Sequence, residues 1–146
     1  LREYAVDLVS RLRSARPEIA VGADLIAGFP TETEEHHAAN LSIIEALDIV
    51  HGHIFPYSPR PGTPAARMPQ LDRGVIKARA ADLRGAVAKR RSAWLEGFVG
   101  EAVSVLAERD GTGYAPSYAR VALPDSARPG EIVNIEIHKV DGGLLR

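Results

Sequence analysis

The most restrictive feature of this sequence is the segment FPYSPRPGTP at residues 55–64, which contains four prolines, two of them close on either side of Arg60. A proline fixes its own φ near about −65° and disfavours helical backbone in the residue before it. The segment is therefore predicted to be neither helix nor central strand. We expect an ordered, extended connector directly after a buried strand.

Before the connector, the sequence alternates between helical and strand patterns. The spacing of Ala5, Leu8, Val9 and Leu12 predicts an amphipathic helix that Pro17 ends. The apolar run IAVGADLIAGF that follows is typical of a strand buried on both faces, as in a parallel sheet. The run IVHGHIFPY, whose last three residues are the first three of the connector, predicts a second strand.

A second helix is predicted between these two strands. Thr31 is a candidate N-cap, and Glu34 three residues later would complete a capping box. The order helix, strand, helix, strand with short connections favours parallel βαβ topology, and two parallel strands cannot close a core alone. The inner face of the second helix is predicted to carry Ala38, Leu41, Ile44 and Leu47.

The second half of the chain begins with a long helix, predicted from Arg73 to Phe98. After this helix, apolar residues recur at every second position. The segments AVSVLAE, SYARVAL and EIVNIEIHKV alternate apolar and polar residues, with turn signals such as DGTG and DGG between or after them. We expect a small antiparallel β-barrel here. The predicted domains are residues 1–98 and 99–146. The apolar face of the helix is expected to hold Ile76, Ala80, Leu83, Val87, Trp94 and Phe98.

Composition narrows the class of protein further. The 146 residues are 45% hydrophobic, enough for a core, and carry no Cys, which excludes disulfides and thiolate-bound metal or iron–sulfur clusters within this chain. No apolar run of about 18 residues and no secretion signal is found, so we expect a cytoplasmic location. The chain begins with Leu1 and its only methionine is Met68, which indicates a piece of a longer protein.

The end of the first predicted strand is a candidate ligand site. Gly28, Phe29 and Pro30 follow the strand where the next helix begins, and ligands of βα folds bind outside the carboxyl ends of strands. Gly28, without a Cβ, would let a flat ligand or another backbone come close. The alternative is a plain strand-to-helix turn. Glu32 and Glu34 are likewise open to two interpretations, since the helix dipole stabilises acids in a first turn without any ligand.

The histidines indicate a binding site less clearly than the strand end does. His51 and His53 lie on one side of a strand, which suits either a metal or core packing. His36 and His37 are predicted to be solvated residues on a helix surface.

Charge is unevenly distributed although the formal net charge is only −1. Residues 31–48 hold five acids and no Lys or Arg, whereas residues 73–91 hold seven Lys or Arg against one Asp. A basic helix can be a simple solvated face. Next to a β unit that carries tyrosines and cations, it favours nucleic-acid binding by stacking and phosphate neutralisation. The β-unit candidates are Tyr114, Tyr118, Arg120, Lys139 and Arg146, and those on the helix are Lys89, Arg90 and Arg91.

Several motifs together resemble the carboxyl-terminal part of the radical S-adenosylmethionine methylthiotransferases. They are ADLIAGFPTETEEH, HIFPYSPRPGTPAARMPQ, the basic helix, FVGEAVSVLAE, GYAPSYARV and GEIVNIEI, and the resemblance covers nearly the whole chain. It implies the later part of a β/α barrel followed by a TRAM domain, a small RNA-binding β-barrel. His37 departs from the family, which usually has an aromatic or other apolar residue there.

The resemblance also implies roles for particular residues. S-adenosylmethionine would lie near the first strand end, and Arg60 would point at substrate or cofactor. Two 4Fe-4S clusters belong to the complete enzyme, but their cysteine ligands are not in this chain, which should be inactive alone. The expected cofactor-binding residues are Asp24, Gly28, Phe29, Pro30, Glu32, Tyr57 and Ser58.

The HIFPYS motif resembles the branch that adds a methylthio group to threonylcarbamoyladenosine beside the tRNA anticodon. Two alternatives stay open, the branch that modifies a ribosomal protein and an RNA-binding adaptor with no enzymatic parent. Besides tRNA, a second copy of the chain is an expected partner, because a βαβ piece has unpaired strand edges.

Overall fold

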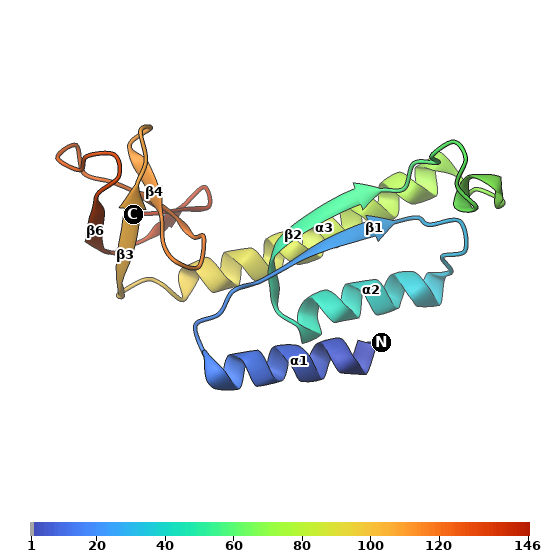
Figure 1. The fold of residues 1–146 in the computed structure, drawn as a ribbon, viewed down its shortest axis with the longest axis horizontal. Helices are drawn as coiled ribbons and strands as arrows, with labels where there is room; N and C mark the ends of the chain where they lie inside the picture. The colour runs from blue at the N-terminus through green and yellow to red at the C-terminus, as the bar shows by residue number, and fades with distance from the viewer. Residues whose placement is uncertain (1) are drawn as a thin grey trace. The chain divides into compact units, whose positions relative to one another are not determined.

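The computed structural model describes residues 2–146, and Leu1 lies outside the described residues (Figure 1). Contacts divide the chain into two compact units. The first comprises the residues up to Pro17 together with Val21–Arg90, and the second comprises Glu18–Ala20 and Arg91–Arg146. The predicted domains at residues 1–98 and 99–146 stay a prediction.

The first unit is an α/β arrangement built on two parallel strands. Its elements are α1 (Arg2–Ala15), β1 (Val21–Ala27), α2 (Glu34–Ala46), β2 (Ile49–Pro56), the short 3-10 helix η1 (Ala65–Arg67) and the amino-terminal part of α3 (Arg73–Glu96). β1 and β2 pair in parallel, with Asp24 opposite His53 and Ala27 opposite Pro56. The predicted parallel βαβ topology is confirmed.

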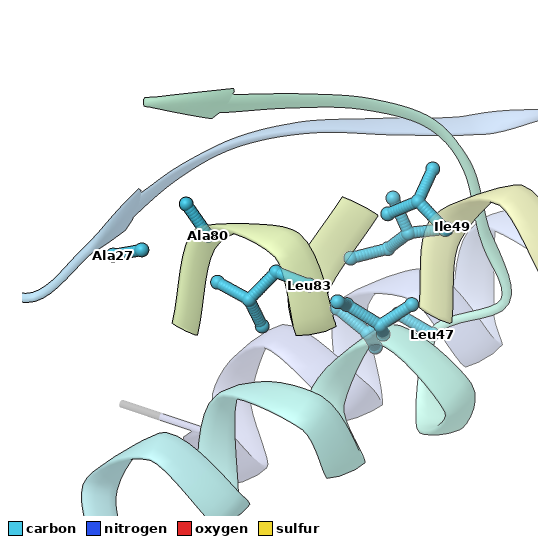
Figure 2. Close-up of a cluster of buried hydrophobic side chains, with 7 residues drawn as sticks. Ala27, Leu47, Ile49, Ala80 and Leu83 are labelled. Carbon is cyan, nitrogen blue, oxygen red and sulfur yellow. The ribbon is translucent and has the colours of Figure 1, made fainter. Parts of the chain in front are cut away.

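One face of this two-stranded sheet carries the core. Buried side chains from β1, α2, β2 and α3 meet there, and Figure 2 shows Ala27, Leu47, Ile49, Ala80 and Leu83 among them. The α1 residues Ala5, Val6 and Val9 pack against the same cluster. The three α-helices α1, α2 and α3 therefore contribute to the same core.

The opposite face of the sheet is open. The alternate β1 residues Gly22, Asp24 and Ile26 are exposed, as are His53 and Phe55 on β2. The prediction that the first strand is buried on both faces is therefore wrong for this chain, because helices cover only one face. The predicted inner face of α1 is also partly wrong, since Leu8 and Leu12 are exposed.

The N-cap of helix α2 lies two residues later than predicted. Thr33, rather than Thr31, is the N-cap, and the His36 side chain completes the capping box in place of Glu34. The inner face of α2 carries His37 where Ala38 was expected, and Ala38 is exposed. The buried face of α2 therefore includes His37 in place of the predicted Ala38.

The proline-rich connector begins inside β2. Phe55 and Pro56 pair with Ile26 and Ala27, and the Tyr57 N–H donates to the Ala27 carbonyl at 2.8 Å, so pairing reaches the end of the predicted strand run IVHGHIFPY. A strand with an open edge tolerates proline, because that edge needs no donor. Beyond Tyr57 the connector has no regular structure until η1.

The second unit is a six-stranded mixed sheet with the strand order β6-β3-β4-β5-β8-β7. The pair β5–β8 is parallel and the other pairs are antiparallel, so the purely antiparallel prediction is wrong for one pair. No β6–β7 pairing closes a barrel among residues 2–146. The strands are β3 (Ala102–Ala107), β4 (Thr112–Tyr114), β5 (Arg120–Ala122), β6 (Ile132–Glu136), β7 (Val140–Asp141) and β8 (Leu144–Leu145).

A separate core fills this second unit. Leu95 of α3 packs with Val105, Val121, Ile137 and Leu145, which are fully buried. The turn predicted at DGTG is partly wrong, because Thr112 and Gly113 belong to β4 and pair with β3 and β5.

Within residues 2–146, no helix combines the length and apolarity required to cross a bilayer.

Candidate functional site

The turn after β1 is fixed by close packing at Gly28. This residue is buried and has a φ of +78°, a conformation that side chains with a Cβ rarely adopt. A Cβ added there would lie 2.7 Å from Cγ1 of Ile76 on α3. The close approach anticipated at Gly28 is therefore made by a side chain of the protein itself.

Glu32 holds the same turn from inside the protein. Its Oε2 accepts a hydrogen bond from the Gly28 N–H at 2.9 Å, and its Oε1 accepts one from Arg79 Nη1 at 3.1 Å. Arg79 Nη1 also donates to the Glu32 carbonyl oxygen at 2.9 Å. Both carboxylate oxygens are thus engaged, and the Glu32 side chain is 5% exposed.

Arg79 joins this turn to the start of α2. Its Nη2 donates to Oε1 of Glu34, and this hydrogen bond raises the pKa of the Arg79 guanidinium above its ordinary value, while burial acts in the opposite direction. Buried charges are tolerated when they are paired and hydrogen-bonded. The cluster of Gly28, Glu32, Glu34 and Arg79, which we name the turn clamp, therefore ties β1, α2 and α3 together.

His37 lies beside the turn clamp. It is buried, and its Nε2 lies 3.2 Å from Oδ2 of Asp82 on α3, so the prediction of a solvated surface residue is wrong. The reason is the position of His37 on the inner face of α2, one turn before Leu41. His36 is exposed as predicted, and its ring also accepts from the Thr33 N–H.

Three of the predicted cofactor residues have exposed side chains. Asp24 lies on the open sheet face, Ser58 follows the end of β2, and Phe29 is 38% exposed. The Phe29 and Tyr57 rings meet edge to face, with centroids 5.4 Å apart. A cofactor at this strand end could contact these side chains, whereas Gly28 and Glu32 are occupied within the turn clamp. Pro30 is half-buried.

The described residues contain no group of three or more His, Asp or Glu side chains that could hold a metal ion. His51 and His53 therefore have no set of further ligands beside them in this part of the chain. Iron–sulfur clusters would need thiolates, and the sequence has no Cys.

The predicted basic surface of α3 is only partly available for binding. Arg90 pairs with Asp48, with Nε 2.7 Å from Oδ1, and the Arg91 guanidinium lies 5.8 Å from the centre of the Trp94 ring. Lys89 is exposed. Arg60 and Lys139 are exposed too, and none of these three has an ion pair among the residues that the structure describes.

The second unit displays two tyrosines together. Tyr118 is 72% exposed, and its ring centroid lies 6.4 Å from that of Tyr114. Tyr118 also has a φ of +62°, which is unusual for a bulky residue and costs free energy. The tight turn that imposes this φ is closed by the Tyr118 N–H, which donates to the Ala115 carbonyl at 2.8 Å.

Arg120 lies opposite Tyr114 in the β4–β5 pair. Its Nη2 donates to Oδ2 of Asp110 at 2.6 Å, and its Nε donates to Oγ1 of Thr112 at 3.1 Å. The hydrogen bond from the Thr112 hydroxyl lowers the pKa of the Asp110 carboxyl below its ordinary value. Arg120 is therefore held in place beside the tyrosines, and Arg146 likewise pairs with Asp141 at 3.2 Å.

Two residues of this surface were missed by sequence reasoning. Leu106 of β3 pairs with Ile132 of β6 on one side and with Tyr114 of β4 on the other, and both Leu106 and Ile132 are exposed. The alternation in AVSVLAE and EIVNIEI could have placed them on one face, but not shown that this face is open. We name the set Ile132, Leu106, Tyr114, Tyr118 and Arg120 the aromatic row.

Comparison with known proteins identifies tRNA-modifying enzymes as relatives of this chain. No family model matches the chain. The threonylcarbamoyladenosine tRNA methylthiotransferase MtaB of Rickettsia prowazekii is 34% identical over 145 residues, which are 99% of this chain and 34% of that protein. Two tRNA-2-methylthio-N(6)-dimethylallyladenosine synthases also match. That of Paracoccus denitrificans is 39% identical over 75% of this chain and 26% of its own length, and that of Cereibacter sphaeroides is 37% identical over 92% and 33%.

These matches extend across both units. The chain therefore belongs to the radical S-adenosylmethionine methylthiotransferase family and corresponds to the carboxyl-terminal end of its members. It spans about a third of the length of the MtaB protein of Rickettsia prowazekii.

Proposed function

We propose that this chain is the carboxyl-terminal part of a tRNA methylthiotransferase, in which the second unit is a TRAM-like domain that binds RNA. The observation that carries the proposal is Tyr118, an exposed tyrosine in a conformation that costs free energy, next to Tyr114. Base stacking on such rings contributes about 1–3 kcal/mol per base. Arg120, Lys139, Lys89 and Arg60 would add contacts to phosphates.

The first unit would contribute part of the cofactor wall. Its open sheet face carries Asp24, and Phe29, Tyr57 and Ser58 follow the strand ends. In the complete enzyme this face would line a β/α barrel that binds S-adenosylmethionine. The two 4Fe-4S clusters would be held by cysteines elsewhere in the protein, so this chain alone would be inactive. When bound, they would supply the radical initiation and the sulfur.

Within the family, we propose the branch that acts on threonylcarbamoyladenosine. The MtaB relative, which is named for that nucleoside, matches 99% of the chain. Relatives named for dimethylallyladenosine make that branch the second candidate. A branch that modifies a ribosomal protein is disfavoured by the tyrosines of the aromatic row. A cytoplasmic location and self-association through the edges of β1 and β2 complete the proposal.

The RNA-binding proposal can be tested on the full-length protein that carries this chain. Tyr118→Ala should weaken tRNA binding by about 1–3 kcal/mol and leave the salt dependence unchanged, because stacking releases no counterions. Lys89→Met should instead reduce the slope of log affinity against log salt by about 0.7–0.9. Fluorescence anisotropy with labelled tRNA at several salt concentrations measures both effects.

Tyr4→Ala is the matched control, because Tyr4 is 69% exposed and lies on α1, outside the proposed surface. It should bind tRNA like the wild type. Equal tRNA affinity of the wild type and Tyr118→Ala would contradict the proposed role of the aromatic row.

A further inference from the structure

A cavity of about 460 Å³ lies between the start of the proline-rich connector and α3. Its volume is in the range of ordinary small-molecule sites. Pro56, Pro59, Leu71 and Ile76 give it apolar walls. None of the residues that line it is acidic in the part of the chain that the structure describes.

The polar rim of this cavity is cationic. Arg73, Lys77 and Arg84 line it, and their spacing along α3 places them on one face of the helix. Arg73 and Lys77 form no ion pair among residues 2–146. Asp72, the nearest acid in sequence, is turned to the helix terminus, where its Oδ1 accepts from the Gly74 N–H at 2.7 Å.

Arg84 and Tyr57 also shape the site. Arg84 Nη2 donates to the Ile54 carbonyl oxygen at 3.2 Å, which holds this guanidinium beside β2. Tyr57 lines the cavity, and its hydroxyl oxygen is buried with no hydrogen-bond partner among the described residues. The ring, rather than the hydroxyl, is therefore the part of Tyr57 that a ligand in the cavity could contact.

We propose that this cavity binds one nucleotide of the RNA substrate, with the base against the apolar walls and the phosphate near Arg73 and Lys77. The inference rests on the proposed function, which supplies RNA as the partner. The cationic rim argues against S-adenosylmethionine here, because its sulfonium group is itself a cation. It complements a phosphate, whose oxygens accept charge-assisted hydrogen bonds from Arg and Lys. The site lies in the first unit and is separate from the aromatic row.

The test uses the full-length protein and three probes in calorimetry: adenosine 5′-monophosphate, adenosine and S-adenosylmethionine. Adenosine 5′-monophosphate should bind, and adenosine should bind at least about tenfold more weakly, because it lacks the charged group. The double variant Arg73→Met, Lys77→Met should weaken nucleotide binding by about tenfold or more.

The matched control is Arg11→Met, which removes an exposed cation of α1 far from the cavity in sequence. It should bind the nucleotide like the wild type. In tRNA titrations the double variant should also lose about 0.7–0.9 of salt slope for each cation removed.

The outcomes separate this proposal from the proposed function. Unchanged nucleotide affinity in the double variant, with tRNA binding still sensitive to Tyr118→Ala, would overturn the cavity proposal alone. Competition by S-adenosylmethionine, with the same loss in the double variant, would make the cavity a cofactor site and also overturn it. Nucleotide binding at the cavity without any tRNA binding would overturn the assignment to RNA and the proposed function together.

Discussion

Gly28 is constrained twice, by its backbone conformation and by the side chain of Ile76. Gly62 shares the first constraint, with a φ of +86°, but nothing lies within 4 Å of where its Cβ would be. The two glycines therefore separate the cost of a positive φ from the cost of close packing. A substitution at Gly28 also cannot report on cofactor binding alone, because it disturbs the packing of α3.

Gly62→Ala should lower the free energy of unfolding by about 1–2 kcal/mol, the usual cost of a left-handed conformation for a residue with a Cβ. Gly28→Ala should lose about 1–3 kcal/mol more, because the new methyl group overpacks against Ile76. Urea denaturation followed by circular dichroism compares the two variants. Equal losses would show that Ile76 moves aside at no cost.

Arg79 is the residue on which the turn clamp depends. Arg79→Met should lower the free energy of unfolding by about 3–5 kcal/mol, because it leaves the Glu32 carboxylate buried without its cation. Adding Glu32→Gln should recover part of this loss by removing the unpaired charge. As a control, Arg11→Met breaks the exposed pair with Asp7 and should cost about 0–1 kcal/mol. An Arg79→Met loss as small as the control's would contradict the clamp.

The position of Gly28 could be predicted from the sequence, but its contact partners could not. The motif GFPTETE placed Gly28 correctly at a strand end, because an apolar run, a glycine and a helix start are all local signals. It could not identify Ile76 or Arg79 as partners, since both lie more than forty residues later in the chain. His37 was misplaced for a related reason: which side of α2 is buried depends on α3.

At the level of elements, the β4–β5 hairpin combines strain with exposure. Tyr118→Gly should keep or raise the free energy of unfolding, by up to about 1–2 kcal/mol, because glycine adopts a positive φ without a steric cost. The same change should weaken tRNA binding through the loss of the ring. Tyr118→Ala should lose affinity to a similar degree without the gain in stability. A clear loss of stability in Tyr118→Gly would show that the ring contributes to the fold.

The elements themselves were largely predictable from periodicity. α1, α2 and α3 lie where the three-and-four spacing predicted them, β1 and β2 lie in the predicted apolar runs, and β3 lies in an alternating segment. The β5–β8 parallel pair was not predictable, because β8 is two residues long and follows two glycines that signal only a turn. The aromatic row needed the strand register, which sets Leu106 between Ile132 and Tyr114.

For the whole molecule, the open sheet face is the feature that most clearly calls for additional structure. A sheet of two strands with one face uncovered leaves Ile26 and Phe55 exposed, at 54% and 50%. Large exposed apolar side chains that lie next to each other mark surfaces that are normally covered. The β/α barrel that we propose for the complete protein would cover this face.

The function proposed above is that the protein carrying this chain helps to add methylthio groups to tRNA. Its most direct test is mass spectrometry of nucleosides from the tRNA of cells with and without the gene. We expect the methylthio derivative of threonylcarbamoyladenosine to be lost with the gene and to return with the full-length gene on a plasmid. Loss of the dimethylallyl derivative instead would move the protein to the other branch, and an unchanged nucleoside profile would contradict the claim.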